Sequence, residues 1–175
     1  MRKIVLISIL CSVAFAEIGN FKKIIDGDTI DIGNDRCRFA YIDTPESKIN
    51  ERLKRKLESC NGVTVETMVE AGEMAKNHLS KYLIKGTSYK YEVISKDRYG
   101  RSVCEIYSNG ELINLKMVAE GYAVPYFQYI PENKKSLFRK ASQEAKKNNN
   151  GLYKLNLSAI KCIEWRKYHE WFKWY

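Results

Sequence analysis

The 175-residue chain is poor in histidine, with only His78 and His169. Two imidazoles are too few for a His-rich metal centre, and they disfavour reaction classes that need several such groups. The sequence also lacks internal repeats and low-complexity linkers, and none of its cysteine spacings resembles a zinc site. These absences favour one compact domain, in which any catalysis relies on carboxylates and guanidiniums.

Long apolar runs are scarce as well, and the one at the N-terminus is short. Ile4–Leu10 follows a basic start, and Ala14–Ala16 ends the segment with the pattern Ala-x-Ala. Such a run is too short for a stable membrane span, so residues 1–16 are predicted to be a cleavable signal peptide. We expect an exported, periplasmic or secreted protein without an integral membrane span after cleavage. The alternatives are an uncleaved anchor, a buried first strand or, because of Cys11, a lipoprotein.

Four cysteines remain after export, and an even number in an oxidising compartment favours disulfides. Cys60 and Cys162 lie outside the predicted strands, and their bridge is the first pairing to test. Cys37 and Cys104 lie in alternating segments typical of core strands, where reduced thiols can pack as small apolar groups. Four unpaired cysteines are the alternative.

Short alternating segments predict strands between residues 21 and 42 and between 88 and 107, separated by Asp-Gly, Gly-Asn and Asn-Gly turns. Helices are predicted over residues 67–84, 115–120 and 133–147. The stretch 47–60 is predicted to be a mobile basic loop or a short exposed helix. The pattern indicates an α+β fold that is mainly β, a five-stranded OB-fold barrel with about three packed helices. We expect a domain over 17–155 and a basic aromatic tail over 156–175.

The net charge is +9, with 30 Lys and Arg against 21 Asp and Glu, which indicates a partner rich in phosphate or another anion. Three acidic segments adjoin the predicted strands: Asp26-Gly27-Asp28-Thr29, Asp43-Thr44-Pro45-Glu46 and Asp97-Arg98-Tyr99-Gly100-Arg101. Each alone is ordinary turn chemistry. Together their oxygen ligands favour calcium or magnesium. With Arg38 and Arg101 nearby, they predict a site that hydrolyses a phosphodiester.

These three segments, in this order, resemble the signatures of the thermonuclease (staphylococcal nuclease) family, and the similarity runs from about Phe21 to Lys147. The resemblance implies an OB-fold enzyme that hydrolyses DNA and RNA with calcium and leaves 3′-phosphate ends. It implies calcium ligands in the carboxylates of Asp28 and Asp43 and the carbonyl of Thr44. Asp26 would support these ligands from behind.

The resemblance also assigns the remaining site residues. Glu46 would be the general base, and Arg38 and Arg101 would clamp the scissile phosphate. Four residues would bind the substrate: Arg98, Tyr99, Phe127 and Tyr129. Phe127 stands where the family has a tyrosine, so one phosphate contact is expected to be lost while stacking is kept.

The expected substrate is single-stranded DNA or RNA, cut by a monomer, because the chemistry needs access to an unstacked nucleotide. The alternative is a catalytically silent OB-fold module that binds nucleic acid. A third class is membrane-surface binding through the basic aromatic tail. Five charged groups directed at one point favour the enzyme over both.

Overall fold

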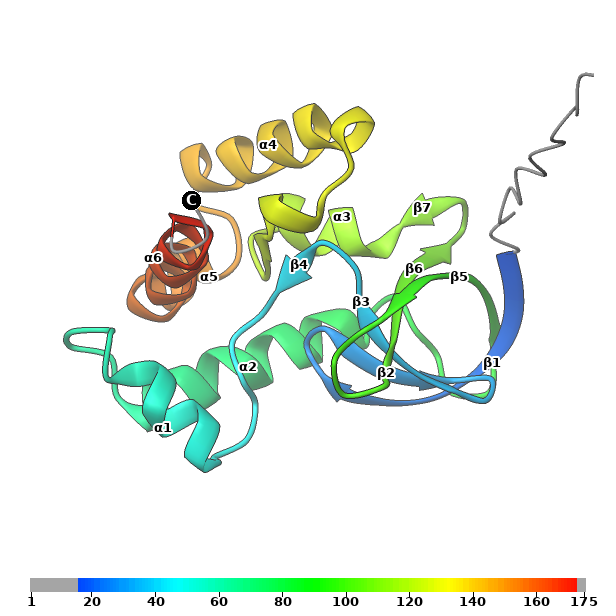
Figure 1. The fold of residues 1–175 in the computed structure, drawn as a ribbon, viewed down its shortest axis with the longest axis horizontal. Coiled ribbons are helices and arrows are strands. Elements are labelled where there is room, and N and C mark those ends of the chain that lie inside the picture. The colour runs from blue at the N-terminus through cyan, green and yellow to red at the C-terminus, as the bar shows by residue number, and fades with distance from the viewer. Residues whose placement is uncertain (1–15, 173–175) are drawn as a thin grey trace, which may run out of the picture.

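The structure, a computed structural model, describes residues 16–172 (Figure 1), so the predicted signal peptide lies almost wholly outside the described residues. The described strands are β1 (Ala16–Asp26), β2 (Thr29–Ile32), β3 (Asp35–Phe39), β4 (Ile42–Asp43), β5 (Ser88–Lys96), β6 (Ser102–Ser108), β7 (Glu111–Leu112) and β8 (Val124–Pro125). The helices are α1 (Glu51–Leu57), α2 (Val65–Leu79), α3 (Ile113–Ala119), the 3-10 turn η1 (Phe127–Tyr129), α4 (Glu132–Lys147), α5 (Leu152–Leu155) and α6 (Leu157–Phe172).

The main sheet is mixed and almost closes on itself. Its order is β3-β2-β1-β5-β6-β7, and β3 also pairs with β6 in parallel, so that the pairings of five strands form a ring. The other pairs in this sheet are antiparallel, and β4 and β8 form a separate two-stranded ladder. The fold is therefore mixed α+β with a dominant sheet, as the sequence predicts.

Within residues 16–172 the structure has six α-helices instead of about three. The stretch around α1 is helical because the Asn50 side chain accepts the backbone N–H of Leu53 at 2.8 Å, an N-cap. The segment predicted as an aromatic tail also forms a helix, α6, with Ile160 and Ile163 on its buried side. The prediction counted only segments with a strong apolar period, and α1 and α6 owe their order to capping and tertiary packing.

The molecule has two apolar cores. The first fills the strand ring beneath α3 and α4, and the second lies among α1, α2, α5 and α6. Figure 1 shows the strands at the right, α1, α5 and α6 at the left, and α2 running between the two groups. Helix α2 is buried against both cores, because its N-terminal half contributes Met68 and Ala71 and its C-terminal half Ala75 and Leu79. The cleft described below lies between these two groups of elements.

Each of the two groups contains one disulfide. Cys60 and Cys162 join the end of α1 to α6, which confirms the predicted bridge. Cys37 and Cys104 also form a disulfide, so the prediction that these two thiols stay reduced is wrong. The parallel pairing of β3 with β6 brings their Cα atoms within 5.6 Å, a normal distance for the bond. Alternation predicted that both side chains are buried, but it carried no information on this register.

In the part of the chain that the structure describes, no helix combines the length and apolar character needed to cross a bilayer.

Candidate active site

The turn between β1 and β2 packs directly on the segment that follows β4. A methyl group added at Gly27 would lie 2.9 Å from Thr44 Oγ1 and 2.9 Å from the Cβ of Ala75. Only glycine leaves room for this approach, since real Cβ atoms essentially never come so close. The two acidic motifs, separate in the sequence, therefore meet, and Asp28 and Asp43 lie at one point.

Arg38, on β3, lies between these two aspartates. Its Nη1 is 2.9 Å from Asp28 Oδ2, and its Nη2 is 2.5 Å from Asp43 Oδ1. The two aspartates are only 3% and 5% exposed. A planar guanidinium that reaches both holds the three side chains in one fixed arrangement.

The two aspartates have opposite pKa shifts. Burial raises the pKa of Asp28, and Arg38 offsets this only in part. Burial opposes ionisation of Asp43 as well, but Lys167 and Arg38 hold the pKa of Asp43 well below its usual range. The difference arises because Lys167 contacts Asp43, with Nζ 3.1 Å from Oδ2. Asp43 is thus the firmly ionised member of the pair.

Asp26 supports the segment that carries Glu46. Its Oδ1 accepts the backbone N–H of Ser47 at 3.1 Å and that of Gly27 at 2.9 Å. Burial, together with the charges of Asp28 and Glu46, raises the pKa of Asp26 to about 6. Asp26 therefore acts as a backbone acceptor that ties the β1–β2 turn to the segment after Glu46.

Gly72 on α2 provides the surface beneath Glu46. A methyl group at Gly72 would lie 2.4 Å from both the carbonyl carbon and the carbonyl oxygen of Glu46. The helix backbone and the Glu46 backbone are therefore in direct contact. Sequence reasoning missed this residue, although a glycine in the middle of a predicted helix is a signal for close packing.

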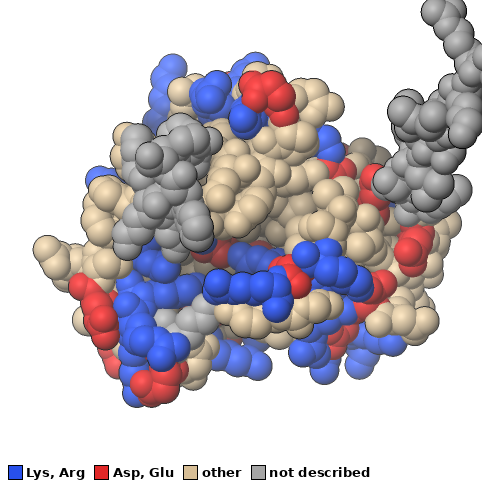
Figure 2. Space-filling view, in the orientation of Figure 1, with Lys and Arg blue, Asp and Glu red and all other residues tan. Residues whose placement is uncertain are grey.

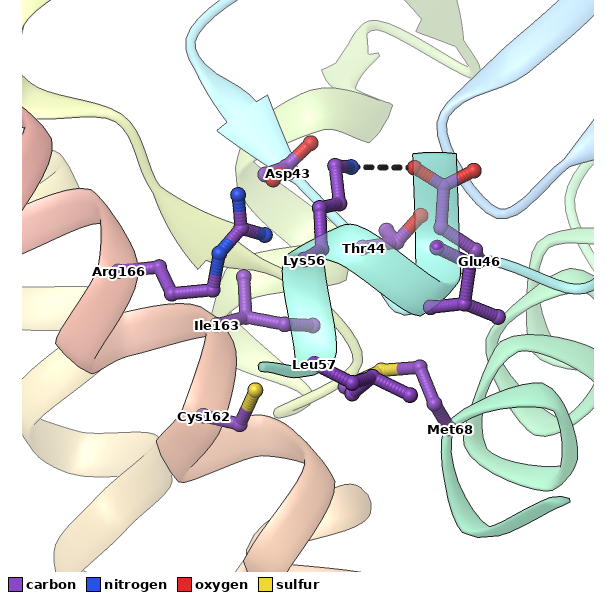
Figure 3. Close-up of a pocket in the computed structure, with 10 residues that line it drawn as sticks. Asp43, Thr44, Glu46, Lys56, Leu57, Met68, Cys162, Ile163 and Arg166 are labelled. Atoms are coloured by element: carbon purple, nitrogen blue, oxygen red, sulfur yellow. Dashed lines mark hydrogen bonds and ion pairs between the residues drawn. The ribbon is translucent and has the colours of Figure 1, made fainter. Parts of the chain in front are cut away.

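Two lysines from the helical end of the molecule reach the carboxylates. Lys56 on α1 contacts Glu46 Oε1, and Lys167 on α6 contacts Asp43. Figure 3 shows Lys56 directed at Glu46, with the Arg166 side chain extending from α6 towards Asp43. Sequence reasoning missed all three basic residues. The one available signal was the cysteine pair that links their helices.

The turn between β5 and β6 carries the second predicted arginine. Arg101 pairs with Asp97, its Nε and Nη2 each 2.7 Å from Asp97 Oδ2. The Arg98 guanidinium lies 4.9 Å from the centre of the Tyr99 ring, and that of Arg101 lies 5.7 Å from it. The structure thus groups Arg98, Tyr99 and Arg101 on one turn, and Arg101 contacts an acid of that turn and not the aspartates bound by Arg38.

A cleft of about 1110 Å³ is lined by Arg38, Asp43 and the turn between β5 and β6, while Glu46 and Thr44 line a smaller adjoining pocket that shares Asp43 and Lys56 with it. One side, here called the strand wall, consists of Arg38, Phe39, Tyr41, Ile42, Asp43, Ile94, Ser95, Asp97, Arg98, Tyr99, Arg101, Val103, Tyr126, Gln128 and Tyr129. The other side, here called the helical wall, consists of Arg55, Lys56, Ser59, Trp165, Arg166, Lys167 and His169. Figure 2 shows Lys and Arg side chains gathered around a hollow on this face.

The aromatic residues after β8 divide between the cleft and the core. Tyr126 and Tyr129 line the cleft, with ring centroids 4.7 Å apart in an edge-to-face arrangement. Phe127 instead packs against the first core, with the Arg139 guanidinium over its ring at 5.6 Å. In a 3-10 turn side chains three apart lie on one side, so the spacing of Tyr126 and Tyr129 was the signal that sequence reasoning missed.

Residues 36–155 match the family model described as "Staphylococcal nuclease homologue". This is more than half of the chain, and it includes Arg38, Asp43, Glu46 and Arg101. The chain belongs to the staphylococcal nuclease family.

Several named proteins are similar to this family member. It is 33% identical over 133 residues to "Thermonuclease" of Staphylococcus intermedius, which covers 72% of this chain and 70% of the relative. It is 28% identical over 148 residues to "Endonuclease YhcR" of Bacillus subtilis (strain 168), a match that covers 79% of this chain and 11% of the relative. It is 30% identical over 132 residues to "Staphylococcal-like nuclease CAN1" of Arabidopsis thaliana, a match that covers 75% of this chain and 33% of the relative.

The chain therefore spans most of the thermonuclease but only 11% of the bacterial endonuclease and 33% of the plant nuclease. Family membership and these relatives support an enzyme of the nuclease class, a hydrolase. Helix α6 begins at Leu157, after the last residue that the family model matches. The part of the helical wall that α6 supplies thus lies outside the family match.

The donor chemistry of this staphylococcal nuclease homologue fits a hard divalent cation. Asp28 and Asp43 offer carboxylate oxygens at one point, and the Thr44 backbone follows directly. The sulfurs of the adjoining pocket belong to Met68 and to the disulfide-bonded Cys162, so neither is a thiolate ligand. Over residues 16–172, however, no three His, Cys, Asp or Glu residues are grouped closely enough to hold a metal by themselves. The site supplies two carboxylates, so backbone oxygen and water would complete the coordination.

Proposed function

We propose that this protein is an exported, calcium-dependent, sugar-non-specific nuclease that hydrolyses DNA and RNA and leaves 3′-phosphate ends. The nuclease class is supported by the family match. The observation that carries the proposal is the fork of Arg38 between two buried aspartates, with Arg38 and Asp43 lining a basic cleft. A phosphodiester needs both elements, oxygen ligands for a cation and a guanidinium for its own charge.

In this proposal Asp28, Asp43 and the Thr44 carbonyl hold calcium. The bound cation would supply Lewis-acid polarisation of the phosphate. Glu46 accepts a proton from the attacking water, because its carboxylate lies beside the aspartate cluster on a backbone fixed by α2.

Water attacks phosphorus, and the bond from phosphorus to the 5′ oxygen breaks, so that the phosphate stays on the 3′ side. Arg38 and Arg101 neutralise the charge that the phosphate gains in the transition state. Arg101 exchanges its contact with Asp97 for the phosphate. Arg98, Tyr99, Tyr129 and Phe127 remain the proposed substrate contacts, although Phe127 would have to act from the edge of the core.

The ring of five strand pairings is interpreted here as the OB-type barrel of the family. The proposed domain is 17–155, the segment 156–175 is appended to it, and the active form is a monomer. The substrate is proposed to be single-stranded, since the tyrosines of the cleft offer ring faces to unstacked bases.

The decisive experiment is cleavage of single-stranded DNA with calcium and then with excess chelator. The full exported chain should cut with calcium, stop with chelator and recover when calcium is restored. Glu46→Gln keeps the shape of the side chain but removes the base, so it should abolish cleavage and preserve binding. Glu58→Gln is the matched control, because Glu58 is exposed at the end of α1 and does not line the pocket that contains Glu46.

Cleavage that persists at full rate in chelator would rule out metal assistance. Binding of single strands without cleavage under any divalent cation would favour the alternative, a catalytically silent OB-fold module that binds nucleic acid. End-group analysis of the products tests the 3′-phosphate separately.

A further inference from the structure

Apart from Lys56 and Lys167, which contact Glu46 and Asp43, the helical wall has no role in the chemistry proposed above, yet its composition is that of a nucleic-acid surface. Seven Lys or Arg residues line the whole cleft against two acids, Asp43 and Asp97. Four of the seven come from the helical wall: Arg55, Lys56, Arg166 and Lys167. A cleft so charged attracts a polyanion along its length and not only at the scissile phosphate.

Helix α6 adds an aromatic surface to this charge. The rings of Trp165 and His169, one turn apart, have centroids 4.1 Å apart. His169 Nδ1 donates to the Trp165 carbonyl oxygen at 2.7 Å, which fixes the orientation of the imidazole. Trp165 is 47% exposed, although Ile160 and Ile163 of the same helix pack in the second core. An indole held in this way, at the edge of a basic cleft, offers a flat face to a base.

The two helices of this wall are held as one unit. The Cys60–Cys162 disulfide joins the segment after α1 to α6, and Arg55 on α1 and Ser59 just after it line the cleft. Preorganisation of this kind lowers the ordering cost of binding. The wall faces the strand wall across one continuous cleft of about 1110 Å³, more than the roughly 1,000 Å³ upper range of small-molecule pockets. There is room for more than one nucleotide.

We propose that the helical wall is a second substrate subsite, which binds the single strand beyond the scissile phosphate. Trp165 and His169 stack a base, and Arg55 contacts a backbone phosphate. The occupant is a continuation of the strand that enters the catalytic site, because both walls line the same cleft and the stacking surfaces require unpaired bases. This inference rests on the proposed function and deepens it.

The test compares short and long substrates on the full chain. Binding of a thymidine dinucleotide and of a single strand of about 12 nucleotides is measured in chelator by fluorescence anisotropy, and cleavage of both is measured with calcium. Trp165→Ala should weaken binding of the long strand about tenfold and leave the dinucleotide unaffected, while Trp165→Phe should restore most of the loss.

Arg55→Ala tests the charge of the same wall. In a plot of the logarithm of the long-strand binding constant against the logarithm of the salt concentration, the slope should become shallower by about 0.7. This is the value for one phosphate contact of a single strand. Lys54→Ala is the matched control, because Lys54 is an exposed cation on the same helix that pairs with Glu51 and does not line the cleft. Arg55 is exposed too, so neither variant should affect folding.

The outcomes separate the two proposals. If the parent protein cuts neither substrate, the proposed function fails. If it cuts both, and Trp165→Ala and Arg55→Ala bind and cut the long strand as the parent does, the second subsite is overturned. If the two variants lose as much affinity for the dinucleotide as for the long strand, the second subsite is overturned as well. Binding of the same variants to anionic vesicles is measured in parallel. If Trp165→Ala and Arg55→Ala bind vesicles more weakly than the parent protein but bind oligonucleotides as the parent does, the second subsite is overturned and the wall is assigned to a lipid surface.

Discussion

The strand wall and the helical wall of the cleft reach the same carboxylates by different means. Arg38 on the strand wall lies five residues before Asp43 and joins it through adjacent strand ends. Lys167 on the helical wall joins the same aspartate from the last described helix. This difference shows that turn motifs in a sequence predict only those site residues that lie close to the motif along the chain. The predictions below test whether the two walls are as separable in function as they are in origin.

The largest expected effect comes from removing the disulfide that holds the two helices of the helical wall together. Cys60→Ser with Cys162→Ser opens a loop with a sequence separation of 102, which in the chain-entropy model lowers the free energy of unfolding by about 4 kcal/mol. Denaturant unfolding measures this loss. If the walls are separable, cleavage of a dinucleotide at low temperature should persist while long-strand affinity falls.

The double variant Cys37→Ser with Cys104→Ser is the comparison. It has a similar expected cost, about 4 kcal/mol for a separation of 67, but it removes a cross-link beside Arg38. Here dinucleotide cleavage should fall with stability. Identical activity profiles for the two double variants would show that the walls act as one unit.

The next effect concerns the strand wall alone. Arg101→Ala removes one preorganised donor for the transition state, so kcat should fall by about a hundredfold or more, equivalent to about 3 kcal/mol. Single-strand affinity should fall much less, because the remaining cations of the cleft supply the general electrostatic attraction. Arg98→Ala, on the same turn but exposed, is the control and should change binding more than turnover. The reverse pattern would exchange the proposed roles of the two arginines.

Gly72→Ala tests the support beneath Glu46. Helix propensity alone would stabilise α2 by about 1 kcal/mol, but the new methyl group meets the Glu46 backbone. We expect lower stability and a loss of roughly tenfold in kcat, since small misplacements of a catalytic group are costly. Thermal unfolding and single-turnover cleavage measure the two. A stabilised, fully active variant would contradict the close packing.

The smallest expected effect is on calcium affinity, at the contact between Lys167 of the helical wall and Asp43 of the strand wall. Lys167→Met keeps the apolar stem but removes the positive charge from Asp43, so calcium binding should tighten by a few-fold, about 1 kcal/mol or less in a partly solvated site. Isothermal titration calorimetry reads this directly, without cleavage. Lys161→Met, on the exposed side of α6, should leave the affinity unchanged. Weaker calcium binding in the first variant would mean that Lys167 positions Asp43 more than it competes with the cation.

Sequence reasoning found the strands and most of the strand wall, because Asp-Gly and Asp-Thr-Pro turns report local geometry. It placed Asp28, Asp43 and Arg38 together for that reason, and the structure has them in contact. It missed the Cys37–Cys104 bond, which depends on which strand closes the ring. Lys56 and Lys167 were beyond its reach too, since their contacts arise from packing between distant segments.

The position of α6 in the chain has a consequence for biosynthesis. Every motif of the strand wall precedes α6, so a ribosome completes the segments that hold Asp28, Arg38, Asp43 and Arg101 before it makes Lys167. A nascent chain or a truncated product that ends before Leu157 carries the family motifs without four of the seven residues of the helical wall. Proteolytic trimming at the junction after Leu155 would therefore convert the two-walled cleft into an open surface. If the helical wall is the second subsite, the length of strand that the protein binds depends on a segment made after every family motif.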